Sequence, residues 1–174
     1  MGTPTSLPSN KTIFKKGELA KYLYRVESGC IRAYSKLNGG RRRIHAFYFP
    51  GEYFGLETSE VHSIFVETVE PSIVHLVKRK ALVSRSARDI DIVNFLLHIT
   101  TMELQRIQNH NLLLLKGVPE RLVDFLREIQ RRNQSQSEVD LPMPRSDIAD
   151  YLGLTIETVS RAFTRLKKLQ LFPC

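Results

Sequence analysis

The stretch R-S-D-I-A-D-Y-L-G-L-T-I-E-T-V-S-R-A-F-T-R-L-K-K, residues Arg145–Lys168, contains two short runs whose apolar residues recur at helical spacing. Gly153 separates the runs, and glycine adopts the positive φ of a tight turn without a steric penalty. Thr155 can cap the second run, because its hydroxyl oxygen can accept a hydrogen bond from an unpaired backbone N–H. Glu157 suits the positive end of the same helix. The stretch therefore predicts a helix-turn-helix.

The two predicted helices have distinct inner and outer faces. The apolar side chains that would face each other are Ile148, Leu152, Leu154, Val159, Phe163 and Leu166. Ala149 is small at the point where the two helix axes approach closely. The outward positions of the second helix are Glu157, Thr158, Ser160, Arg161, Thr164 and Arg165. Because such side chains can contact base edges and phosphates, the motif predicts a DNA-binding surface; the plainer alternative is a helical hairpin with ordinary polar faces.

Composition narrows the possible classes of protein. The chain has 174 residues, of which 42% are hydrophobic, so it can bury a core as one domain or two small ones. A net charge of +8 suits an anionic partner such as nucleic acid. Residues 1–9 lack the features of a signal peptide, and the chain has no apolar run long enough to span a membrane. We expect a cytoplasmic protein without a membrane partner.

The first half of the chain, residues 12–83, has an all-β pattern. The predicted strands are Thr12–Phe14, Tyr22–Val26, Cys30–Lys36, Arg43–Phe49, Ser63–Val69 and Ile73–Lys78. Residues typical of turns separate them, and Asn38-Gly39 between two of these strands strongly indicates a hairpin. Short strands at this spacing predict a sandwich or barrel, which we assign to residues 1–87.

Residues 88–116 follow a helical period instead. An apolar stripe with alternating steps of four and three residues comprises Val93, Leu97, Thr100, Leu104, Ile107, Asn111 and Leu114. This a/d stripe favours a long helix that pairs with a second copy of the chain, in which Asn111 would fix the register. The alternative is that the stripe packs on the β domain, and other apolar residues of the helix would allow it to do both.

Residues 117–174 form the third predicted unit, a DNA-binding domain. Gly117-Val118-Pro119 predicts a hinge, with Pro119 in the first turn of the next helix. That helix is amphipathic through Val118, Leu122, Val123, Phe125, Leu126 and Ile129. Residues Arg131–Asp140 are polar and predict a loop before the helix-turn-helix.

The order of barrel, long helix, hinge and helix-turn-helix resembles the CRP/FNR family of bacterial transcription regulators. The residues that carry the resemblance are Ile13–Glu18, Tyr24–Arg32, Phe49–Leu56 and Arg145–Arg161. The family implies an α+β fold: a jelly-roll-like β-barrel of the cyclic-nucleotide-binding type, a dimerisation helix and a winged helix-turn-helix, here lacking most of its wing. The pattern Glu-x-x-Ser-Arg resembles the FNR and FixK branches, because CRP has Arg at the position of Ile156 and Gly at that of Ser160.

The resemblance implies base contacts by Glu157, Ser160 and Arg161. Arg161 can donate two hydrogen bonds to guanine, Glu157 can accept from a cytosine or adenine amino group, and Ser160 can meet a thymine. The expected target is a TTGAT-like inverted repeat bound by a homodimer that controls genes for low-oxygen, respiratory or nitrogen metabolism. The candidates for phosphate contacts are Arg145, Thr155, Thr158 and Arg165. RNA polymerase is a further partner by family analogy.

The residues favour no sensed ligand, cofactor or metal. Cyclic-nucleotide-binding relatives hold the cyclic phosphate with an Arg-Ser or Arg-Thr pair, and the nearest corresponding residues here are His62-Ser63. A neutral histidine lacks the charged, forked geometry of arginine, and Glu52 and Glu57 would add negative charge nearby. Two distant cysteines cannot supply the four thiolates of the FNR iron–sulfur centre. The chain has no catalytic triad, P-loop or dinucleotide motif, so we expect no enzyme.

Both ends of the chain are short for this family. Upstream of Thr12 there is little room for the helix and first strand that usually open the barrel. The recognition helix is expected to end near Leu169, where relatives continue into a β-hairpin wing. The alternative function is therefore a truncated dimerising protein that binds DNA poorly and titrates full-length regulators.

Cys174 is a candidate redox site, because it lies just past the predicted recognition helix. Oxidation there would add bulk and negative charge beside a DNA phosphate and weaken binding. Under this hypothesis the wild type and Cys174→Ser differ in the peroxide sensitivity of DNA binding, and equal responses reject it. Cys30 is expected to be a small buried hydrophobic residue in a barrel strand.

Overall fold

The N-terminal part of the chain is a sandwich of two antiparallel sheets. The structure, a computed structural model, describes residues 2–133 and 141–168. In this part of the chain the strands are β1 (Thr3–Leu7), β2 (Thr12–Phe14), β3 (Tyr22–Ser28), β4 (Ile31–Lys36), β5 (Arg42–Tyr48), β6 (Tyr53–Phe54), β7 (Phe65–Thr68) and β8 (Ser72–Lys78). Their order is β1-β8-β3-β6 in one sheet and β2-β7-β4-β5 in the other. The predicted all-β unit is confirmed.

Alternating side chains of both sheets fill the space between them. Val26, Ile31 and Phe54 are at most 1% exposed and belong to one hydrophobic cluster there. The predicted hairpin joins β4 to β5 through a short 3-10 turn, η1 (Asn38–Gly40), in which Gly39 has φ 78°. A glycine is needed at such a backbone angle, because other L-residues are strained there.

The structure differs from the sequence-based predictions at four places. Tyr53–Phe54, which was not predicted as a strand, forms β6 and pairs with β3. Thr3–Leu7 does form a first strand, which pairs along β8 at the edge of its sheet. Residues 79–83, included in the all-β range, belong to helix α1 (Arg79–Ser86), whose Ala81 and Leu82 are good helix formers. The predicted polar loop starts too early, because α3 (Val118–Asn133) continues through its first three residues.

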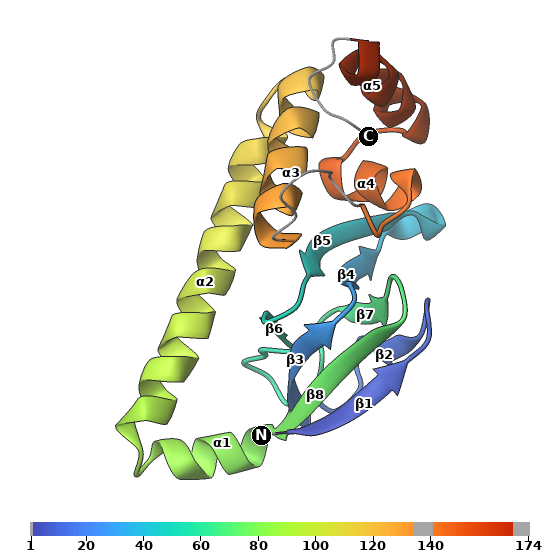
Figure 1. Ribbon diagram of the computed structural model, residues 1–174. Coiled ribbons are helices and arrows are strands. Elements are labelled where there is room, and N and C mark those ends of the chain that lie inside the picture. The colour runs from blue at the N-terminus through green and yellow to red at the C-terminus, as the bar shows by residue number, and fades with distance from the viewer. Residues whose placement is uncertain (1, 134–140, 169–174) are drawn as a thin grey trace.

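A single long helix, α2 (Ile90–Leu114), runs along one side of the molecule, as Figure 1 shows. Asp89 caps it by accepting a hydrogen bond from the Asp91 backbone N–H at 3.1 Å. After the chain reverses, α3 lies beside the second half of α2. Helices α4 (Arg145–Leu152) and α5 (Ile156–Lys168) follow, with α4 beside β5 (Figure 1).

A second hydrophobic core joins the barrel to the C-terminal helices. It contains Tyr34 and Phe47 of the barrel together with Leu122, Phe125 and Tyr151 of α3 and α4, all at most 7% exposed. The Phe47 and Tyr151 rings lie 5.4 Å apart between centroids. The helix-turn-helix is therefore packed on the barrel rather than held by a linker alone. Of the helices in the described ranges, none is long and apolar enough to cross a membrane.

Candidate DNA-binding surface

The turn between α4 and α5 has the geometry that the sequence predicts. Gly153 ends α4 in the left-handed conformation, with φ 66° and ψ 37°, and its N–H donates to the Ala149 carbonyl. A Cβ at this position would also lie 2.8 Å from the Arg43 guanidinium. The backbone angle therefore favours glycine, whereas the Arg43 side chain could move aside, and the sharp turn sets the angle between the two helices.

Thr155 caps the start of α5. Its hydroxyl oxygen accepts a hydrogen bond from the Thr158 backbone N–H at 3.2 Å. The pKa of the Glu157 carboxyl is held below its ordinary value by its own backbone N–H and by the Thr155 hydroxyl, with a smaller contribution from Arg161. Glu157 is therefore a carboxylate at neutral pH and can accept a hydrogen bond from a base amino group.

The inner face of the helical pair is buried as predicted. Ile148, Leu152 and Val159 are at most 1% exposed, while Phe163 and Leu166 are 5% and 7% exposed. Ala149, also buried, leaves room for the close approach of α5, and Leu154 packs against the same core. The packing fixes the orientation of α5, so its opposite face is presented to solvent.

The outer face of α5 is polar and uncovered. Glu157, Arg161, Thr164 and Arg165 are exposed there, whereas Thr158 and Ser160 are half-buried. Arg145 reaches this face from α4: its guanidinium lies 5.2 Å from the centre of the Phe163 ring and 3.5 Å from Ser160 Oγ. The structure thus gathers all the predicted base-reading and phosphate-binding residues on one surface.

The predicted seam on α2 is likewise uncovered in the single chain. Val93, Leu97, Leu104 and Ile107 are between 39% and 64% exposed. Thr100 and Asn111 are exposed as well, and Leu114 is half-buried. The opposite side of the helix faces the protein, where Ile99 and Leu113 are buried. Most of the stripe is therefore not covered by the barrel, and the face that carries it is free to contact a partner.

A carboxylate occupies the corner of the barrel formed by His62 and Ser63. Glu57 Oε1 accepts from the Ser63 backbone N–H at 3.0 Å and from its hydroxyl at 3.3 Å, and it lies 3.4 Å from His62 Nδ1. The His62 ring stacks on Phe14 with 3.5 Å between centroids. Burial lowers the pKa of the His62 imidazole, although Glu57 opposes the shift. These donors are therefore already used within the chain.

The two cysteines have separate outcomes. Cys30 is fully buried, as expected, and burial raises the pKa of its thiol, so a thiolate is disfavoured there. Cys174, the candidate redox site, and the predicted missing wing both lie outside the described residues. In the described ranges no three His, Cys, Asp or Glu side chains form a group that could hold a metal ion.

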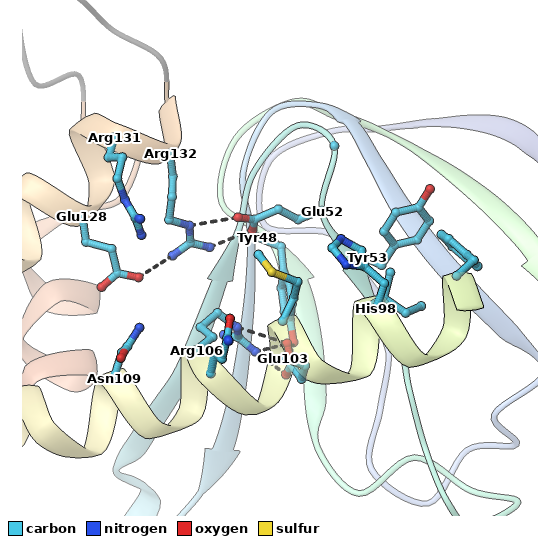
Figure 2. A pocket seen from close by; sticks show the side chains of 15 residues that line it. Tyr48, Glu52, Tyr53, His98, Glu103, Arg106, Asn109, Glu128, Arg131 and Arg132 are labelled. Atoms are coloured by element: carbon cyan, nitrogen blue, oxygen red, sulfur yellow. Dashed lines mark hydrogen bonds and ion pairs between the residues drawn. The ribbon is translucent and has the colours of Figure 1, made fainter. Parts of the chain in front are cut away.

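Where the barrel, α2 and α3 meet, they line a pocket of about 350 Å³ that is partly open to solvent, shown in Figure 2. Two arginines on its wall are paired: Arg132 with Glu52 and Glu128, and Arg106 with Glu103. The pairing of Arg132 with Glu52 and the polar contacts between the barrel and α4 were not predicted, because they join residues far apart in the sequence. The pairs Glu103–Arg106 and Glu128–Arg132 lie three and four residues apart on one helix, a spacing that could have indicated them.

Comparison with known proteins supports a DNA-binding protein made of a sensor-type barrel and a Crp-like motif. The Cyclic nucleotide-binding domain family matches residues 4–89, and the Crp-like helix-turn-helix domain family matches residues 120–172. The Nitrogen fixation regulation protein FixK of Azorhizobium caulinodans is 41% identical over 174 residues, or 97% of this chain and 70% of that protein. The chain therefore belongs to the CRP/FNR family of transcription regulators.

Further relatives agree with this assignment. The FixK protein of Rhizobium meliloti is 37% identical over 162 residues, which cover 92% of this chain and 74% of that protein. The solved structure of FixK2 from Bradyrhizobium japonicum is 40% identical, with a TM-score of 0.93, over 98% of this chain and 86% of that one. The predicted family is confirmed, and so is the fold class apart from the missing wing, which lies outside the described residues.

Proposed function

We propose that this chain is a homodimeric, sequence-specific transcription regulator that binds a TTGAT-like inverted repeat. The observation that carries the proposal is the outer face of α5, where Glu157, Ser160 and Arg161 lie together on an uncovered surface. Arg161 donates to guanine O6 and N7, Glu157 accepts from a base amino group, and Ser160 contacts a thymine. These three contacts specify the sequence of each half-site.

Four further residues position the protein on the DNA backbone. Arg145, Thr155, Thr158 and Arg165 surround the base-reading residues and are the proposed phosphate contacts. Phosphate contacts add affinity without sequence information, and they make binding salt-dependent because counterions are released. The excess of cationic residues, a net charge of +8, favours the same partner.

The proposed dimer seam is the stripe on α2 from Val93 to Leu114. An exposed a/d stripe of this length buries its apolar side chains when two copies pair in parallel, and Asn111 fixes their register. Two-fold pairing then presents two copies of α5 to half-sites about one helical turn apart. The interpretation divides the chain into a barrel (1–87), a dimerisation helix (88–116) and a DNA-binding domain (117–174).

The proposed regulon is genes for low-oxygen, respiratory or nitrogen metabolism. Relatives named for nitrogen fixation regulation and for fumarate and nitrate reduction support it. We further propose that the protein acts in the cytoplasm, contacts RNA polymerase and uses no cofactor.

Binding to a TTGAT-type palindrome and to a scrambled duplex of equal length, at two salt concentrations, tests the proposal. We expect a clear preference for the palindrome in the wild type. Arg161→Ala should remove that preference, whereas Arg165→Ala should weaken both complexes and lower the salt slope by about one unit. Arg88→Ala, a matched exposed arginine between α1 and α2, should change neither result. A folded dimer without sequence preference would instead favour the truncated, regulator-titrating alternative.

A further inference from the structure

Helix α4 is fixed to the barrel by a buried carboxylate. Asp147, in the first turn of α4, is 1% exposed, and each of its oxygens meets a guanidinium from the barrel. Arg32 of β4 pairs with Oδ2, and Arg42 of β5 pairs with Oδ1 at 2.8 Å. Asp147 lies 115 residues from Arg32 and 105 from Arg42 in the chain, so this contact joins two distant segments.

The barrel holds Arg32 ready for this contact. Its Nε donates to Glu67 Oε1 at 2.7 Å and its Nη2 donates to Asn10 Oδ1 at 3.0 Å. Burial alone would lower the pKa of the Arg32 guanidinium, but Asp147 and Glu67 outweigh burial and raise it. Arg32 is therefore a buried cation, held by Glu67 and Asn10 of the barrel, that pairs with Asp147 of α4.

Neighbouring residues of α4 reinforce the same placement. Arg42 also reaches Asp150 Oδ2 at 3.2 Å, and Arg43 donates to the Asp150 carbonyl at 3.4 Å. On the α2 side, His110 Nε2 donates to the Tyr151 carbonyl at 3.0 Å, and the two rings stack 4.0 Å apart. One turn of α4 thus contacts both the barrel and the helix that carries the proposed seam.

Helix α3 provides a second attachment. Arg132 forms an ion pair with Glu52 of the β5–β6 turn at 2.7 Å and donates to the Phe47 carbonyl at 2.5 Å, as the view of the pocket in Figure 2 partly shows. This pair is more exposed than the Asp147 cluster, because the Glu52 side chain is 33% exposed. Of the two attachments, the Asp147 cluster is the more completely desolvated one.

A buried ion pair adds little net stability, because desolvation opposes the attraction between the charges. Breaking one member, however, leaves an uncompensated buried charge, which is strongly unfavourable. The Asp147 cluster therefore penalises other placements of α4 more than it stabilises the fold. Such a contact restricts geometry, and α5 follows α4 through the rigid turn at Gly153.

We propose that Asp147 is a positioning residue for DNA binding: it holds α4 on the barrel so that α5 lies at a fixed distance from the α2 seam. This inference rests on the proposed function, because it assumes two recognition helices on one two-fold site. A dimer with clamped helices fits a single half-site spacing. We call the contacts of Asp147 with Arg32 and Arg42 the clamp. Releasing it leaves each recognition surface intact but lowers the fraction of dimers whose two α5 helices fit the half-site spacing. The apparent affinity for the inverted repeat falls in proportion to that fraction.

A set of duplexes whose half-site spacing is varied by one or two base pairs tests this. We expect the wild type to favour one spacing, and Asp147→Asn to reduce that preference by about tenfold. Affinity for a single half-site should stay within about twofold of the wild type, because α5 is unchanged. Arg42→Gln should also reduce the spacing preference, but by less. This variant tests the proposal if Asp147→Asn fails to fold. Arg41→Gln is the control: it removes the exposed arginine next to Arg42 in the chain and should leave the spacing preference unchanged.

Distances between two labels on one protomer provide a readout that needs no DNA. Glu60→Cys on the barrel and Thr164→Cys on α5 are both exposed and can be labelled in a Cys174→Ser background, diluted with unlabelled protein. Asp147→Asn should broaden the distance distribution. Unchanged distances together with an unchanged spacing preference would overturn the proposal. If the wild type ignores the palindrome, the proposed function fails, and the distances alone then decide whether Asp147 clamps α4.

Discussion

Helices α4 and α5 belong to one motif but use their charged residues in opposite ways. On α5, Glu157 and Arg161 are exposed and uncovered, and their charges are available to a partner. On α4, Asp147 is buried against Arg32 and Arg42, and its charge is neutralised within the chain. Burial, and not residue type, separates the side chains proposed to contact DNA from those proposed to hold α5 in place.

A substitution in the hydrophobic core shared by α4 and α5 should have the largest effect on stability. Leu152 is fully buried between α4, α5 and the barrel, so Leu152→Ala removes packing and leaves a cavity. We expect a loss of about 2–5 kcal/mol in the free energy of unfolding. Chemical denaturation measures it, with Val83→Ala, an exposed residue of α1 outside the proposed seam, as the control. A loss of unfolding free energy below about 1 kcal/mol would mean that α4 and α5 are not held together by a common core at Leu152.

The exposed face should show the next largest effect. Arg161→Ala should cost about 1–3 kcal/mol of base discrimination per half-site, because a bidentate contact to guanine is lost. Its free energy of unfolding should stay near that of the wild type, since the side chain is exposed. Titrating matched duplexes that differ at one guanine gives the discrimination directly. Retained discrimination would place the base contacts elsewhere.

Removing the N-terminal cap of α5, the Thr155 hydroxyl, should have a moderate effect on stability. Thr155→Ala removes the acceptor for the Thr158 N–H and should lower stability by about 1 kcal/mol. Thr155→Ser keeps the acceptor and should lose much less. If both variants match the wild type in thermal unfolding, the hydroxyl does not cap the helix.

The contact between α4 and α2 should make the stability of the protein depend on pH, and this is the smallest of the four effects. It involves His110 of α2, whose ring stacks on Tyr151 of α4. Burial lowers the pKa of His110, and Arg43, Arg106 and His45 contribute in the same direction. Below the ordinary value near 6.5 the unfolded chain binds the proton more readily, so stability falls as pH drops through that value. His110→Gln should flatten part of this dependence between pH 7 and 5. An unchanged slope would exclude His110 as a contributor, leaving His45 and His62, whose pKa values are also lowered.

Local patterns predicted most of the fold. The strands β2 to β5, β7 and β8, the long helix and the helix-turn-helix follow from alternation, helical period and turn residues that neighbours in sequence determine. Strand β6, only two residues long, was not predicted. The first strand was missed, because Thr3–Leu7 has no alternating apolar pattern and depends on pairing with β8. Its signal lies in its partner strand and not in its own residues.

The candidate site divides in the same manner. Glu157, Ser160 and Arg161 could be predicted because they stand at fixed positions after Gly153 in a recognisable motif. The clamp could not, because Arg32 and Arg42 are more than a hundred residues from Asp147 and nothing in their local sequence marks them as partners. Long-range ion pairs appear only once the tertiary structure places their elements together.

Selection from a pool of random duplexes tests the central claim most directly. The account predicts that wild-type protein enriches a TTGAT-type inverted repeat, with half-sites about one helical turn apart, and that Arg161→Ala loses the enrichment at the guanine. If a folded and dimeric protein enriches no particular sequence, this result contradicts the claim that the homodimer reads DNA through its two copies of α5.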